Sequence, residues 1–366
     1  MGYITVVLFT VTTFLALIER YIRKYKLLLY FLISFALILI AGLRPVGIDP
    51  DSSNYEYTYI HYDTPNALEG VEYSYLFLSM IFNKITSDVH ILFLFYALLG
   101  VGIKFFAFRK LSNTYFLPVI VYIGYYFIMH ECMQIRTGIL SAVFLLYIKA
   151  IGDGEKKNAI FLLLIGLLFH YSALLLLPFL FFSNEPLNKK GRLYWGAAIL
   201  IAYIIAILGF AVLFSTDLDI PYIGNKLALY QKAQEKGMAD TSINIFSPLN
   251  LFSLLLYYYM MYFYDTLRKE NVYFTIMMKV LTFGIVFHVL FSFFPVLAVR
   301  GYMLYSTVTI ILYSNIVSTI KPKWVGIILV ALIAFIFFNY AIPNIGTNLF
   351  WKDSLIIKNE FIYKYK

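Results

Sequence analysis

Residues 89–108 read VHILFLFYALLGVGIKFFAF and are followed directly by Arg109 and Lys110. A helix rises 1.5 Å per residue, so a run of this length crosses the roughly 30 Å hydrocarbon core of a bilayer. Apolar runs of about 17 to 22 residues recur along the chain, close to the length that a spanning helix needs. The sequence therefore predicts an all-α polytopic integral membrane protein.

The composition agrees with this fold class. Hydrophobic residues make up 61% of the 366 residues and charged residues only 13%, which is too little charge for the surface of a water-soluble protein. Cys132 is the single cysteine and excludes a disulfide within the chain or a metal site built from several cysteines. Most of the lysines and arginines behind the net charge of +9 lie in short loops. There they indicate topology and not a nucleic-acid partner.

Loop charge orients the predicted helices, because lysine and arginine collect in cytoplasmic loops. The basic segments 19–26 and 109–110, and the turn 152–158 that follows Lys149, are assigned to the cytoplasm. The acidic interval from Arg44 to Glu72 is assigned to the outside. The resulting count is roughly 11 to 12 transmembrane segments in one membrane domain, 1–366. The same topology predicts an external active-site loop at 44–87, a second external loop at 215–247 and a C-terminal tail at 343–366.

The apolar block 159–182 fits this alternation only as a broken pair of helices. A single span would carry the basic residues 189–192 to the outer face. A re-entrant pair that turns at His170 keeps them inside, and non-helical backbone at that depth implies a cavity. The same tracing predicts that residues 130–136 are exposed outside and that residues 295–300 form a short outer turn.

The predicted topology brings six polar residues to the outer face: Arg44, Asp49, Glu72, Arg136, His170 and Arg300. Three arginines at a membrane edge suggest a phosphate or pyrophosphate site. Asp49 or Glu72 could serve there as a general base.

Each residue also has a structural interpretation. An arginine at a helix end often anchors the helix at the interface. Asp49 could cap a turn before Pro50, and His170 could bond a backbone carbonyl in the break. The tyrosines between 55 and 75 could form an interfacial belt or stack on sugar rings.

The absence of three well-known motifs disfavours three classes of enzyme. The chain has no Gly-x-x-x-x-Gly-Lys-Ser/Thr phosphate loop, no Gly-x-Ser-x-Gly elbow and no His-Glu-x-x-His pair, so ATP hydrolysis, serine hydrolysis and zinc proteolysis are disfavoured. The pair Asp49 and Asp51 alone is a weak metal signal. We expect no metal and no cofactor.

Five short motifs occur in a fixed order: Arg44-Pro-Val-Gly47-Ile-Asp49 with Asn54-Tyr55, Glu72-Tyr-Ser-Tyr75, Ile135-Arg136-Thr-Gly138, Phe169-His170-Tyr-Ser172 before Pro178, and Arg300-Gly-Tyr302. In this order the chain resembles the EpsG-type branch of the Wzy-like bacterial polysaccharide polymerases, from the first helix to about Tyr302.

The resemblance implies a glycosyltransferase of the bacterial inner membrane that joins oligosaccharide repeat units carried on a polyprenyl diphosphate, at the periplasmic or external face. The implied reaction inverts the anomeric carbon and needs no metal. Asp49 or Glu72 would act as the base with His170 in the catalytic set, and Arg44, Arg136 and Arg300 would bind the diphosphate. Tyr55, Tyr73, Gln134 and Tyr302 would contact the substrate. Partners would be the lipid-linked substrate, the bilayer, and the chain-length regulator and flippase of the same pathway.

Three rival functions remain open. A transferase that uses a polyprenyl-phosphate sugar donor would need nearly the same site. A lipid-linked oligosaccharide flippase would be expected to show internal repeats and cations along a cavity open to both faces. A membrane O-acyltransferase could use His170, but no signature of an acyl donor accompanies it.

Overall fold

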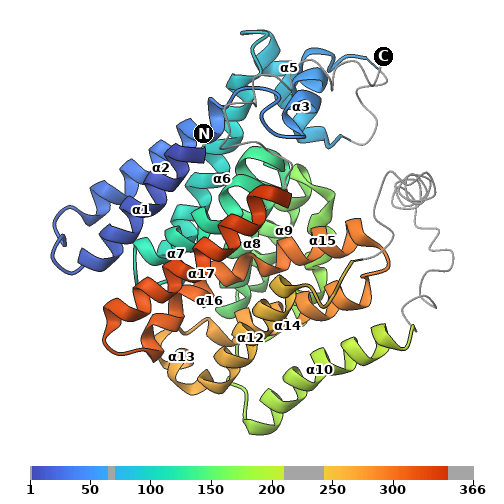
Figure 1. Cartoon of the computed structure of the whole chain (residues 1–366). Coiled ribbons are helices and arrows are strands. Elements are labelled where there is room, and N and C mark those ends of the chain that lie inside the picture. Colours follow the sequence, from blue (N-terminus) through green and yellow to red (C-terminus); the bar gives the residue numbers. More distant parts are fainter. Residues whose placement is uncertain (1, 65–70, 210–242, 345–366) are drawn as a thin grey trace. The chain divides into compact units, whose positions relative to one another are not determined.

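The computed structural model describes residues 2–64, 71–209 and 243–344, and every regular element within these ranges is a helix (Figure 1). The described chain forms two compact units, 1–183 with 309–366, and 184–308. Each unit is described by itself. A single membrane domain over 1–366 stays a prediction.

The first unit contains most of the residues singled out above. Its elements are α1 (Gly2–Ile18), α2 (Lys26–Gly42), α3 (Ser52–Ile60), α5 (Tyr73–Asn83), α6 (His90–Leu111), α7 (Phe116–Val121), η1 (Tyr122–Tyr126), η2 (Ile128–Met133), α8 (Ile135–Gly152), α9 (Lys156–Phe169), η3 (Tyr171–Phe181), α16 (Thr309–Asn315), η6 (Ile316–Thr319) and α17 (Lys323–Asn344).

Helix α6, predicted as the run 89–108, lies between α2 and α8, and α8 also packs on α9. Its buried residues recur every three to four positions and so lie on one broad face, while Leu98 and Phe106 on the other side are exposed. Tyr30 of α2 donates its hydroxyl to the carbonyl of Phe105, 2.7 Å away. Gly42 permits close approach, since a Cβ there would lie 2.8 Å from the Leu94 Cα.

The chain breaks at His170, as the sequence predicted. Helix α9 ends at Phe169, His170 is extended with φ −158° and ψ 130°, and the 3-10 helix η3 follows. η3 returns beside α8, where Tyr147 donates to the carbonyl of Leu176 at 2.8 Å and the rings of Phe144 and Phe179 lie 6.1 Å apart. The broken pair is therefore confirmed. Its position in a bilayer stays a prediction.

The described residues of the interval 44–87 form two short helices, α3 and α5, which lie together near one end of α2 and α6 (Figure 1). Tyr55, Tyr59 and Tyr75 are buried in a core that includes residues of α6 and α8. This finding excludes an interfacial belt at these three positions. Tyr57 and Tyr73 are exposed.

The fourth predicted helix, 115–129, is irregular. A short α-helix, α7, passes into two π-helical segments, η1 and η2, which continue to Met133. The prediction that residues 130–136 are exposed is wrong for the first of them: His130 is 0% and Glu131 2% exposed. They are buried because the helix continues through them and packs on α6 and α8.

The second unit contains α10 (Lys189–Ile207), α12 (Pro248–Tyr262), α13 (Tyr264–Glu270), α14 (Phe274–Leu290), α15 (Pro295–Tyr305) and η5 (Ser306–Val308). The prediction of a turn at 295–300 is wrong, because Pro295 begins α15 and a helix accepts proline in its first turn. The predicted loop at 215–247, up to residue 242, and the tail from residue 345 lie outside the described residues.

Four described helices are long and apolar enough to cross a membrane, and six further apolar helices of 10–17 residues accompany them. The predicted number of 11 to 12 segments therefore stays a prediction.

Candidate functional site

Three elements of the first unit bring Glu72, Arg136 and His170 together. Glu72 has an extended backbone just before α5, Arg136 lies in the first turn of α8, and His170 follows the last residue of α9. The sequence separates them by about a hundred residues, but α5 packs against α9 and α9 against α8. The predicted convergence is thus observed for these three residues.

Glu72 is the centre of this group. Its Oε2 accepts a hydrogen bond from Arg136 Nη1, and its Oε1 lies 3.7 Å from His170 Nε2. The Glu72 side chain is 3% exposed, that of Arg136 21% and that of His170 14%. A buried carboxylate needs such a partner, since an unpaired buried charge is strongly unfavourable. The side chains of Arg136 and His170 are partly exposed at the protein surface.

The hydrogen bonds of His170 fix its tautomer. Its Nδ1 accepts from the backbone amide of Ser172 at 3.0 Å. A neutral imidazole has one donor and one acceptor nitrogen, so the proton lies on Nε2, the nitrogen that faces Glu72. At 3.7 Å this N–H is too far to hydrogen-bond Glu72. Neutral His170 can therefore donate at this edge but cannot accept a proton there.

Two tyrosine rings line the Arg136 guanidinium. The rings of Tyr55 and Tyr75 lie 5.7 and 5.8 Å from its central carbon, within cation–π range. Tyr75 also donates to the carbonyl of Tyr55 at 2.7 Å. Burial raises the pKa of Tyr55 to about 12, although Arg136 opposes the shift. Tyr55 is therefore a neutral part of the wall beside Arg136.

Arg44 and Asp49 form a second, more enclosed pair. Arg44 Nε lies 3.1 Å from Asp49 Oδ2, and the two side chains are 0% and 3% exposed. Arg44 Nη1 donates to the carbonyl of Ala41 at 2.6 Å, and its guanidinium lies 4.0 Å from the ring of Phe93.

The second oxygen of Asp49 is also occupied. Oδ1 accepts from the amides of Asp51 and Ser52 at 3.1 and 2.9 Å, which stabilises the turn that leads into α3. Both oxygens of Asp49 thus have partners within the protein. The ion-pair partner of Glu72 Oε1 is His170 Nε2, which at 3.7 Å lies beyond hydrogen-bond distance. The catalytic role of Asp49 stays a prediction, and the geometry favours Glu72 over it.

Both arginines retain unused donors. Arg44 Nη2 and Arg136 Nε are buried and have no hydrogen-bond partner among the described residues. Buried donors in native proteins are nearly always satisfied by protein or by another group. The Arg44 side chain is 0% exposed and that of Arg136 21%, so of the two it is Arg136 that is accessible to an anion with several oxygen acceptors, such as a phosphate.

The remaining predicted residues lie apart or in the other unit. Tyr73 is 81% exposed, and Gln134 lies half-buried at the junction of η2 and α8. Arg300 and Tyr302 belong to α15 in the second unit, where Arg300 is exposed and Tyr302 packs its ring 4.8 Å from that of His288. Their roles as diphosphate and substrate ligands stay predictions.

The sequence reasoning missed two polar groups. His90 Nε2 lies 3.0 Å from the Arg44 carbonyl and its Nδ1 2.5 Å from Asp88 Oδ1, so it connects the Arg44 turn to the beginning of α6. Lys104 is fully buried against Glu131. Both residues could have been identified from the sequence, because each is an ionisable residue within or beside an apolar run, and ionisable residues inside a spanning segment usually have a function.

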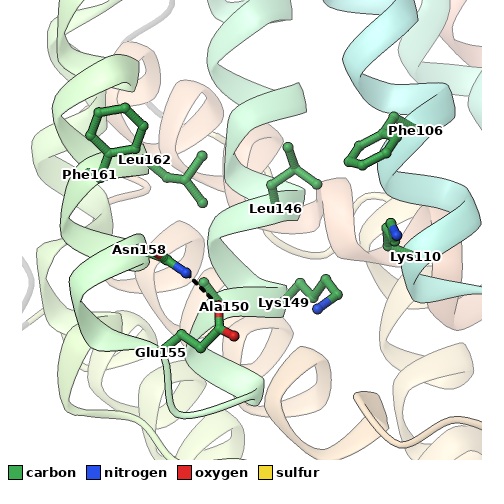
Figure 2. Close-up of a pocket in the computed structure, with 9 residues that line it drawn as sticks. All are labelled: Phe106, Lys110, Leu146, Lys149, Ala150, Glu155, Asn158, Phe161 and Leu162. Atoms are coloured by element: carbon green, nitrogen blue, oxygen red, sulfur yellow. Dashed lines mark hydrogen bonds between the residues drawn. The ribbon is translucent and has the colours of Figure 1, made fainter.

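An open pocket of about 320 Å³ lies toward the other end of α8 from Arg136 and is lined by residues of α6, α8 and α9 (Figure 2). In Figure 2 three apolar side chains, Phe106 of α6 with Phe161 and Leu162 of α9, lie above Lys110 and Lys149. None of the predicted site residues lines it. Among the residues that the structure describes, no group of three or more His, Cys, Asp or Glu could hold a metal ion.

Comparison with known proteins gives a consistent result. The model of the EpsG family matches residues 27–366. The chain is 25% identical over 296 residues to the amylovoran biosynthesis protein AmsC of Erwinia amylovora, a match that covers 76% of each protein. No solved structure matches the chain.

Proposed function

Because this chain belongs to the EpsG family, we propose that it is a membrane glycosyltransferase that joins polyprenyl-diphosphate-linked oligosaccharide repeat units into a polysaccharide. The observation that supports the proposal best is the group formed by Glu72, Arg136 and His170. It combines a carboxylate, a permanent cation and a hydrogen-bond donor, which are the groups that glycosyl transfer from a diphosphate requires.

In the proposed reaction a hydroxyl of the acceptor unit attacks the anomeric carbon of the donor unit. A glycosidic C–O bond forms as the bond between the anomeric carbon and the diphosphate oxygen breaks, with inversion at that carbon. Glu72, whose carboxylate contacts the Arg136 guanidinium, takes the hydroxyl proton. The polyprenyl diphosphate leaves with the bonding electrons.

Arg136 has the geometry to serve two anions. Its Nη1 holds Glu72, while its Nε has no hydrogen-bond partner among the described residues. A diphosphate oxygen at this edge gains charge as the bond breaks, so a fixed guanidinium stabilises the transition state more than the bound substrate. His170 adds the N–H of Nε2, which suits either a phosphate oxygen or the carboxylate.

Arg44 and Asp49 have a supporting role in this proposal. They are nearly inaccessible, and they fix the turn that leads into α3 and so hold Tyr55 against Arg136. We place the site on the external face, because the Arg44–Glu72 interval is acidic, whereas the last turns of α6 and α8 carry Arg109, Lys110 and Lys149.

Replacement of Arg136 by Ala in the producing bacterium tests the proposal. We expect long-chain polysaccharide to disappear while single lipid-linked repeats accumulate on the outer face of the inner membrane. Accumulation of the repeats on the inner face would instead indicate a flippase. Unchanged polysaccharide length would contradict the proposed site.

A further inference from the structure

A second polar cluster lies inside the first unit, between α6, η2 and α8. Lys104 is 0% and Glu131 2% exposed. Lys104 Nζ donates to Glu131 Oε1 at 2.5 Å, and the Tyr122 hydroxyl donates to the same oxygen at 2.9 Å. Charged groups among apolar helices are costly and are usually retained for a function, and the proposed reaction does not use these residues directly.

The neighbouring helices leave space for this cluster. A Cβ at Gly100 of α6 would lie 2.1 Å from Glu131 Oε2, and one at Gly138 of α8 would lie 3.0 Å from the same oxygen. A side chain at Gly100 would collide with the carboxylate, and one at Gly138 would collide with the His130 carbonyl, 2.4 Å from its Cβ. Glu131 is thus inserted between α6 and α8 at the two points where glycine permits it, and Gly138 belongs to the same helical turn as Arg136.

Lys104 connects the two sides of a break in the backbone. The π-helical segment η2 ends with the Gln134 amide donating to the Met129 carbonyl at 2.9 Å, and α8 begins at Ile135. Besides Glu131, which precedes the break, Lys104 Nζ donates to the carbonyl of Gly138, 2.7 Å away and beyond the break. One ammonium group therefore holds η2 and the first turn of α8 in a fixed relation.

Arg136 lies between these two anchor points, two residues after the break. The direction of its side chain depends on the angle at which α8 leaves η2, because a side chain in the first helical turn follows the helix axis. π-helical turns also occur frequently at functional sites. We infer that Lys104 and Glu131 are positioning residues that aim the Arg136 guanidinium at Glu72 and at the substrate diphosphate; the second target rests on the proposed function.

The test separates positioning from simple stabilisation. Lys104→Met alone leaves the Glu131 carboxylate buried without its cation and is expected to unfold much of the protein. The double variant K104M/E131Q removes both charges, so its folding is expected to be near that of the unchanged protein. It still lacks the ammonium that connects Glu131 to Gly138. K104Q/E131Q, which removes the same two charges and keeps polar side chains at both positions, serves if the first double variant does not fold.

The measurements are a structure of the full-length variant by electron cryomicroscopy and kcat for extension of a polyprenyl-diphosphate-linked repeat. We expect the Arg136–Glu72 contact to be lost and kcat to fall by about 10²-fold, since a misplacement of about 1 Å costs that much. The matched control is Lys149→Met with Asp153→Asn, an ion pair at the other end of α8, whose kcat should be unchanged.

An unchanged Arg136–Glu72 contact in the folded variant would overturn the inference. Loss of the contact in the variant, combined with no extension by the unmodified protein, would contradict the proposed function and support the positioning role.

Discussion

The pairing of Glu72 with Arg136 gives the sharpest prediction, because stability and activity respond to it differently. Three variants are needed: Glu72→Gln, Arg136→Gln and the double replacement. Arg136→Gln leaves the 3%-exposed Glu72 side chain without its cation. Removal of one partner from a buried pair costs about 3–5 kcal/mol. We expect the lower part of this range, because a fifth of the Arg136 side chain is exposed.

The double variant carries no buried charge at this position, so its stability should exceed that of Arg136→Gln. A double-mutant cycle should therefore give a coupling free energy of about 2–3 kcal/mol between the two residues. Unfolding of the purified protein in mixed detergent micelles, titrated with sodium dodecyl sulfate, measures each of the four stabilities.

Activity should show no such recovery. Glu72→Gln removes the proposed base, for which the loss is about 10²–10⁴-fold in rate, and Arg136→Gln removes the proposed charge on the leaving group, for which it is about 10²–10³-fold. The double variant should be inactive although it is the more stable protein. The assay is chain extension of a lipid-diphosphate-linked repeat. If activity instead recovered together with stability in the double variant, Glu72 and Arg136 would form only a structural ion pair and would have no catalytic role.

Three further predictions concern the surroundings of this pair. His170→Gln, whose amide can replace the N–H at Nε2, should retain more chain-extension activity than His170→Asn, whose amide replaces only the Ser172 acceptor at Nδ1; equal activities would show that the Nε2 proton is not used. Asp49→Ala should destabilise the protein by about 3–5 kcal/mol, because it leaves Arg44 buried without its carboxylate partner and removes the acceptor of the Asp51 and Ser52 amides. Detergent unfolding with Asp51→Ala as a control measures this, and a loss below about 1 kcal/mol would show that the pair is not needed. The backbone amide and ring of His90 lower the pKa of Asp88 below its usual 3.8, so the stability that this carboxylate adds is present above pH 4 and is lost as the pH falls through the lowered value; the difference in melting temperature between the unchanged protein and Asp88→Asn should shrink in acid, and a difference that grows there would contradict the assignment.

Much of the fold was predictable from apolar run length and loop charge. The run 89–108 became α6, and the break at His170 followed from the charges at 189–192, which no single span could accommodate. These features are local in the sequence or depend on a simple count. The turn predicted at 295–300 is wrong, because α15 already begins at Pro295.

The site was predictable only in part. Motif order identified Glu72, Arg136 and His170, but the partner of each could not be derived, because pairing depends on how α5, α8 and α9 pack. The same limit applies to Asp49, whose second oxygen accepts from the amides of Asp51 and Ser52. Residues 130–136 were predicted to be exposed outside because the fourth helix was expected to end at residue 129, whereas Glu131 is buried with a lysine 27 residues earlier in the chain.

The proposed joining of repeat units is tested most directly when the purified protein, in a defined bilayer, is given only a polyprenyl-diphosphate-linked repeat unit. We predict a ladder of products longer by whole repeats, with one polyprenyl diphosphate released for each bond formed and no product from Arg136→Ala. A preparation that is folded but neither extends the repeat nor releases the diphosphate would contradict this prediction.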